Sequence, residues 1–123
     1  MYILTITLTL LFSQQSAVVV KNNGEEIKLT DITIFQKPNI PSKSAISYSF
    51  RGQKRTLDYS AIRRINLKES LGRKKGVTTW KALLVTRENE KFEIEVDIVE
   101  IGGKNEEGKE EVYSSHTINK ISL

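Results

Sequence analysis

The sequence contains one histidine, His116, and no cysteine. A metal site usually needs several nitrogen or sulfur ligands, and a nucleophile needs a base close to it. A single histidine without cysteine provides neither set, so we interpret His116 as a surface residue within residues 114–117. The absence of cysteine also excludes disulfides, thiolate zinc sites and cysteine nucleophiles.

Acidic side chains form a second group that could carry chemistry. In residues 92–98, Glu93, Glu95 and Asp97 alternate with apolar side chains and therefore share one face of an expected strand. Paired carboxylates can serve as acid and base in glycoside hydrolysis, but the face opposite an apolar stripe is usually solvated. The loop at residues 105–108 lacks the spaced Asp and Asn residues of a calcium site. We therefore predict no enzyme, no metal and no cofactor.

Positive charge is concentrated in one part of the chain. Residues 51–81 hold ten basic and two acidic side chains, whereas residues 88–111 hold ten acidic and three basic ones. Such a chain can pair its own halves, pair with a copy of itself, or present a basic face to an anionic partner.

The sharpest basic cluster lies between two glycines, at residues 72–76. It lacks the spacing of a P-loop, so any contact with phosphate groups of nucleic acid or lipid would be nonspecific and weak. The alternative is a plain solubilising loop. Nearby aromatic residues can stack bases, but their alternation in strands favours the core; they are Tyr48, Phe50, Tyr59 and Trp80. The candidate anion-binding residues are Arg51, Lys54, Arg55, Arg73, Lys74 and Lys75.

The start of the chain suits a secretory signal. Residues 3–12 are uncharged and mostly apolar, with Ser13 or Ala17 before a cleavage point, although no Lys or Arg precedes them. The run is shorter than the roughly 20 residues of a membrane span, so no stable span is expected. Leucine and isoleucine also alternate with threonine there, which is typical of a strand. We predict a signal peptide at residues 1–17 and export to the periplasm, the cell surface or the medium.

Two parts of the chain resemble each other. After their first residue, the segments 61–67 and 117–123 share one pattern: Ile, two polar residues, Ile, a small polar residue and Leu. Residues 17–29 and 82–94 both contain an apolar strand, a turn and an alternating strand. We therefore predict repeat units at residues 18–67 and 82–123, joined by a flexible basic linker at residues 68–81.

The remaining patterns predict an all-β protein. Asn23-Gly24 between apolar runs is a strong hairpin signal, and residues 60–71 are interpreted as a turn and a short closing strand rather than a helix. About eight short antiparallel strands in residues 18–123 predict a single domain, a small barrel or sandwich. The order of strands and turns is similar to small SH3-like barrels, so a duplicated four-strand unit of that kind is expected. This analogy carries no function.

Two functions of different classes follow from these patterns. The first is an exported, non-enzymatic β module that binds an unidentified protein or envelope component, or a copy of itself. The second is a cytoplasmic barrel that binds nucleic acid or another polyanion through residues 51–81. The second requires that residues 1–17 form a strand. A hydrolase that uses acidic pairs ranks behind both.

Overall fold

The computed structural model describes residues 16–42 and 44–123, which form one antiparallel sheet of eleven strands with two short 3₁₀ turns. The predicted all-β class is confirmed. The sheet has more strands than the eight expected, partly because the proline-containing loop at residues 36–44 also forms a strand. The strands are β1 (Ser16–Lys21), β2 (Glu26–Lys37), β3 (Ile40–Ser42), β4 (Ala45–Phe50), β5 (Gln53–Asp58), β6 (Ile62–Lys74), β7 (Val77–Thr86), β8 (Lys91–Asp97), β9 (Glu100–Lys104), β10 (Glu110–Ser114) and β11 (Ile118–Ser122).

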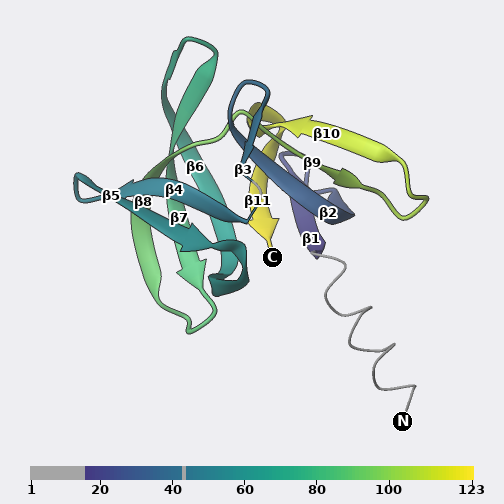
Figure 1. Ribbon diagram of the computed structural model, residues 1–123, viewed down its shortest axis with the longest axis horizontal. Helices are drawn as coiled ribbons and strands as arrows, with labels where there is room; N and C mark the ends of the chain where they lie inside the picture. The colour runs from purple at the N-terminus through teal and green to yellow at the C-terminus, as the bar shows by residue number, and fades with distance from the viewer. Residues whose placement is uncertain (1–15, 43) are drawn as a thin grey trace.

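The sheet curls into two lobes that lie side by side (Figure 1). The strand order is β10-β9-β2-β1-β11-β6-β7-β8-β4-β5, with β3 paired to β2. We call β1, β2, β9, β10 and β11 the first lobe, and β4 to β8 the second lobe. The lobes meet where β11 pairs with β6, with Ile121 opposite Ile65. The second lobe is continuous in sequence, and it interrupts the first.

Residues 68–81, expected to be a flexible linker, form the paired ends of β6 and β7 instead (Figure 1). Arg73 pairs with Thr78, and the turn between the strands is the dipeptide Lys75-Gly76. Both turn residues have positive φ, 53° and 79°, which is the feature of the tight hairpin turns that match strand twist. Glycine at the second position adopts that conformation without steric cost.

Two 3₁₀ turns precede the strands that join the lobes. The turn η1 (Tyr59–Ala61) leads into β6, and η2 (Ser115–Thr117) leads into β11. Residues 60–71 therefore form a turn followed by a strand, as expected, although β6 is long rather than short. Tyr59 and Ser115, the first residues of the two turns, are both buried.

The buried side chains of both lobes form a single cluster. They come from alternate positions of the central strands, because one face of each strand packs inward. Ile94 is 2% exposed while its neighbours Glu93 and Glu95 are exposed, so the predicted alternation in β8 is confirmed. Tyr59 and Trp80 lie in this core, and Tyr48 and Phe50 pack against it, as the strand pattern indicated.

The first strand includes residues that the sequence assigned to the signal peptide. Ala17 is 5% exposed and pairs with Leu29 of β2, so Ser16 and Ala17 belong to the β domain. These two residues lie before the domain start predicted at residue 18. The rest of the predicted signal peptide lies outside the described residues.

Candidate functional site

The six candidate anion-binding residues lie on two hairpins. Arg51, Lys54 and Arg55 belong to the β4–β5 hairpin, and Arg73, Lys74 and Lys75 to the tip of the β6–β7 hairpin. All six are exposed. Figure 1 shows the two hairpin tips projecting in different directions. The structure therefore divides the predicted site into two basic groups.

The turn between β2 and β3 lies close to both groups. Pro38 of this turn lies 3.7 Å from the position that a Cβ atom would take on Gly76, at the β6–β7 tip. Lys37, one residue earlier, lines the same hollow as Lys54 and Arg55. Lys37 is not among the six predicted residues, because it is distant in sequence from residues 51–81. Only the pairing of β2 with β3 brings it to this surface.

No acidic side chain in the described part of the chain forms an ion pair with the six cations. Among residues 16–42 and 44–123 there are three ion pairs, Lys21–Glu25, Lys68–Glu93 and Lys104–Asp31, and none includes a candidate residue. The guanidinium carbons of Arg51 and Arg55 lie 5.1 and 5.0 Å from the centre of the Phe50 ring. Stacking on the ring holds these two side chains in place, and the guanidinium groups remain exposed to solvent.

A hollow of about 760 Å³ lies beside the basic residues of the β4–β5 hairpin. Lys37, Lys54 and Arg55 contribute cations to its wall, but Glu95 and Asp97 contribute carboxylates. The Asp97 carboxylate already accepts a hydrogen bond of 2.5 Å from the Thr79 hydroxyl. The mixed charge makes this hollow a poorer site for a polyanion than the β6–β7 tip, which has three adjacent cations.

The amide side chain of Gln36 has a structural role at the edge of this hollow. Its nitrogen donates to the carbonyl oxygens of Ser47 and Asp97, at 2.7 and 3.1 Å. Its oxygen accepts from the Ser47 backbone amide and the Ser42 hydroxyl, at 3.0 and 3.1 Å. Gln36 thus ties β2 to β3, β4 and β8, and all its polar atoms are satisfied.

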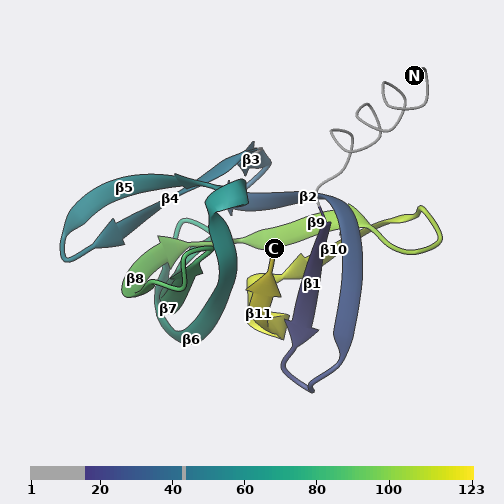
Figure 2. The same cartoon turned by 90° about the horizontal axis from the view of Figure 1, so that it is seen from below.

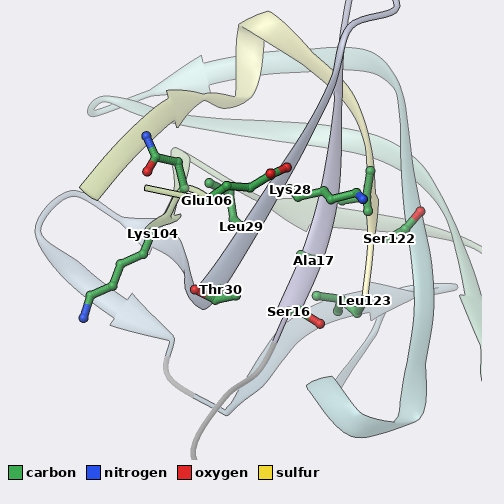
Figure 3. A pocket seen from close by; sticks show the side chains of 11 residues that line it. Ser16, Ala17, Lys28, Leu29, Thr30, Lys104, Glu106, Ser122 and Leu123 are labelled. Atoms are coloured by element: carbon green, nitrogen blue, oxygen red, sulfur yellow. The ribbon is translucent and has the colours of Figure 1, made fainter. Parts of the chain in front are cut away.

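A second hollow, of about 410 Å³, lies at the end of the first lobe (Figure 3). Its lining includes the apolar side chains of Ala17, Leu29 and Leu123. Lys104 lines it too, but its ammonium group pairs with Asp31 at 3.7 Å. None of the six predicted residues lines this hollow, whose wall also includes polar and charged side chains such as Lys28 and Glu106 (Figure 3).

His116 takes part in a polar cluster between the lobes. It is exposed, as expected, and its Nε2 atom lies 2.8 Å from the Thr78 hydroxyl oxygen. The Trp80 ring is 5.2 Å from the imidazole, and its Nε1 donates to the buried Ser115 hydroxyl at 3.0 Å. No carboxylate contacts His116 among the hydrogen bonds and ion pairs of the described residues, so the cluster positions β7 against η2.

The acidic groups also have structural explanations. Glu93, Glu95 and Asp97 are exposed on β8, in agreement with the interpretation as a solvated face. In the β9–β10 turn the Asn105 side-chain oxygen accepts from the backbone amides of Glu107 and Lys109, at 2.9 and 3.0 Å. Within the part of the chain that is described, no three acidic or histidine side chains gather as a metal site would require.

Comparison with known protein families, curated proteins and solved structures finds no match for this chain. Across residues 16–42 and 44–123, no helix has the length and apolar character to cross a membrane.

Proposed function

We propose that this protein is a non-enzymatic binding module that contacts a polyanion through the tip of the β6–β7 hairpin. The observation that carries the proposal is the position of Arg73, Lys74 and Lys75, which are consecutive, exposed and free of ion pairs among the described residues. Adjacent cations on a projecting ribbon can neutralise several phosphates at once and release their counterions. The tight turn at Gly76 fixes the ribbon, so little conformational entropy is lost on binding.

We further propose that the protein is exported and that the polyanion is an envelope component with phosphate groups. The apolar, uncharged residues 3–12 support export. A cleavage after Ser13 agrees with the fold better than one after Ala17, because Ala17 is buried and paired in β1. The alternative target is nucleic acid in a protein that stays in the cytoplasm.

The binding proposal is tested by removing the three charges while the turn is kept. In the variant R73Q/K74Q/K75N, asparagine replaces Lys75 because it tolerates the positive φ of that position. The matched control K28Q/K91Q/K109Q removes three exposed lysines elsewhere. The probes are heparin, vesicles of anionic phospholipid and duplex DNA, each titrated with salt.

The tip variant should bind each probe more weakly and show a flatter salt dependence, by about 2–3 units of log–log slope on DNA. The control variant should retain most of the binding, and the denaturant midpoint should stay the same in both. Equal losses in tip and control variants would mean that net charge alone governs binding. Full retention in the tip variant would refute the proposal.

Export is tested in the source cell. The variant L8R places a charge within the apolar run, so the protein should remain inside the cell with residues 1–13 attached. The mature wild type should lack these residues by mass. An intact N-terminus on the wild type, together with unfolding of L8R, would instead indicate that the segment is part of the fold.

We also propose that the chain arose by duplication of one unit, with the second halves of the two copies exchanged between the lobes. Matching contacts support this. The Asn22 amide donates to Thr117 in the first lobe, and the Arg87 amide donates to Ala61 in the second, both at 2.9 Å. The order across the sheet also matches, since each lobe has a closing strand, a hairpin and a second hairpin: β11-β1-β2-β9-β10 in the first lobe and β6-β7-β8-β4-β5 in the second.

Duplication predicts that the closing strands are interchangeable. Replacing residues 117–123 by the sequence of residues 61–67 keeps both buried isoleucines in register, so the denaturant midpoint should change little. The same insert shifted by one position should unfold the protein, because it turns those side chains away from the core. Similar losses for both inserts would contradict the proposal.

A further inference from the structure

The two ends of the sheet are open. Strand β5 pairs only with β4, and strand β10 only with β9, within the residues that the structure describes. The outer side of each strand therefore presents backbone amide and carbonyl groups that a further strand can pair with. The sheet ends lie on opposite sides of the molecule along its long axis (Figure 1).

The two open edges carry opposite charge. On β5, Lys54 and Arg55 are exposed, and no acidic side chain of the described residues forms an ion pair with them. On β10, Glu110 is exposed, Glu111 is half-buried, and Glu107 lies exposed in the preceding turn. Lys54 and Glu110 occupy corresponding places, because each lies five residues before the first residue of a 3₁₀ turn, Tyr59 or Ser115.

The signs of these charges decide which edges can meet. Two β5 edges would bring lysine and arginine together, and two β10 edges would bring glutamates together, so both like pairings are disfavoured. Of these edge pairings, only that of a β5 edge with a β10 edge brings basic and acidic side chains together. The first and second lobes of one chain hold these edges apart, so the pairing must join different molecules.

We propose that copies of this protein associate head to tail, with β5 of one molecule pairing with β10 of the next. An antiparallel register that places Lys54 opposite Glu111 also places Arg55 opposite Glu110. The same contact covers Val112, which is 58% exposed on β10. Because the two surfaces differ, the association is open-ended unless the rotation between neighbours closes a ring.

The contact is separate from the β6–β7 tip, so it does not depend on the polyanion proposal. It is also sensitive to ionic strength, since exposed charge pairs are screened over about 10 Å at 0.1 M salt. The inferred assembly therefore forms at low salt and dissociates as salt is added.

Charge reversal at each edge tests the proposal. The variant K54E/R55E has two acidic edges, and the variant E107K/E110K has two basic edges. Glu111 is left unchanged because its carboxylate accepts hydrogen bonds from Tyr113 and Asn105. The control R73E/K74E makes the same change in charge on the β6–β7 tip. Sedimentation velocity measures association against protein concentration at low salt, and circular dichroism checks that each variant is folded.

We expect the wild type and the control to form species larger than a monomer as concentration rises. Each edge variant alone should sediment as a monomer, and an equimolar mixture of the two should associate again, because an acidic edge then meets a basic one. A monomeric wild type throughout, or edge variants that associate as the wild type does, would overturn the proposal. Loss of association in the control as well would assign it to net charge rather than to the edges.

Discussion

Tyr59 and Ser115 hold the two lobes together from matching positions. Each is the first residue of a 3₁₀ turn and is almost fully buried. The Tyr59 hydroxyl accepts from the backbone amide of Ile34 in the first lobe, at 3.1 Å, and donates to the Ser42 carbonyl. The Ser115 hydroxyl accepts from Trp80 of the second lobe at 3.0 Å. Each turn thus reaches across to the other lobe (Figure 2 shows the lobes from below).

Removing the Tyr59 hydroxyl should destabilise the fold. Y59F keeps the ring in the core but leaves the buried Ile34 amide and Ser42 carbonyl without this partner, at a cost of about 1–3 kcal/mol. Urea unfolding monitored by circular dichroism measures the change. Y48F is the control, because no hydrogen bond of the Tyr48 hydroxyl is found in the described residues and its loss should cost less than about 0.5 kcal/mol. Equal midpoints for the two variants would contradict the role of Tyr59.

Removing the Ser115 hydroxyl should act through Trp80. S115A leaves the indole Nε1 buried without an acceptor, so we expect a loss of about 1–3 kcal/mol in the free energy of unfolding. In W80F the donor is absent, and the further change S115A should then cost much less. A double-mutant cycle gives this coupling directly. A coupling energy near zero would mean that the hydrogen bond does not contribute.

Local patterns predicted much of the fold. The alternation of apolar and polar side chains in residues 92–98 and the turn at Asn23-Gly24 both appear where they were expected. The extension of β6 and β7 through residues 68–81 was missed, because glycine and three adjacent cations are typical of a loop. Residues 68–74 of β6 are all exposed, so they show no apolar alternation that would indicate a strand. The pairing of β2 with β9 and of β4 with β8 was also not predictable, since pairing between distant strands depends on the whole core.

The candidate site was predicted only in part. Charge density identified the exposed cations of both hairpins, because a cluster of like charges is rarely buried. Charge density did not indicate that the cations divide between two hairpins, or that Lys37 lies beside Lys54 and Arg55. The position of Lys37 depends on the β2–β3 turn, whose Asn39 has a φ of 61°. The opposite charges of β5 and β10 were visible only as a difference between chain segments, because their positions at the sheet edges come from the topology.

The core of the second lobe offers a test of strand alternation. Ile94 is 2% exposed and packs in the shared cluster, so I94A should lower the free energy of unfolding by roughly 2–5 kcal/mol. Glu93 is exposed, and its only ion pair within the described residues is with Lys68 at 3.6 Å, so E93A should cost less than about 0.5 kcal/mol. Chemical denaturation of both variants compares the two faces of β8. Similar losses would mean that β8 does not present a single buried face.

The hydrogen bond between Tyr113 and Glu111 should give the protein two visible pH transitions. The Tyr113 hydroxyl donates to the Glu111 carboxylate at 2.5 Å. This bond raises the pKa of Tyr113 to about 12, with smaller contributions from burial and from the charges of Glu111 and Glu25. The same bond, together with one from Asn105, lowers the pKa of Glu111 below its ordinary value of 4.5.

The direction in which pH changes the stability follows from the protonation state that the fold favours for each group. The fold favours neutral Tyr113, so its stabilisation is complete below pH 10, the model-peptide value, and is lost as the pH rises towards about 12. The fold favours ionised Glu111, so that stabilisation is present above pH 4.5 and is lost as the pH falls through the lowered pKa. Tyrosinate absorbance and carboxyl NMR shifts follow the two groups. E111Q should move the Tyr113 transition back towards 10, and Y113F should raise the pKa of Glu111, whereas E110Q should leave both in place. Unchanged titration of Tyr113 in E111Q would show that Glu111 does not hold that proton.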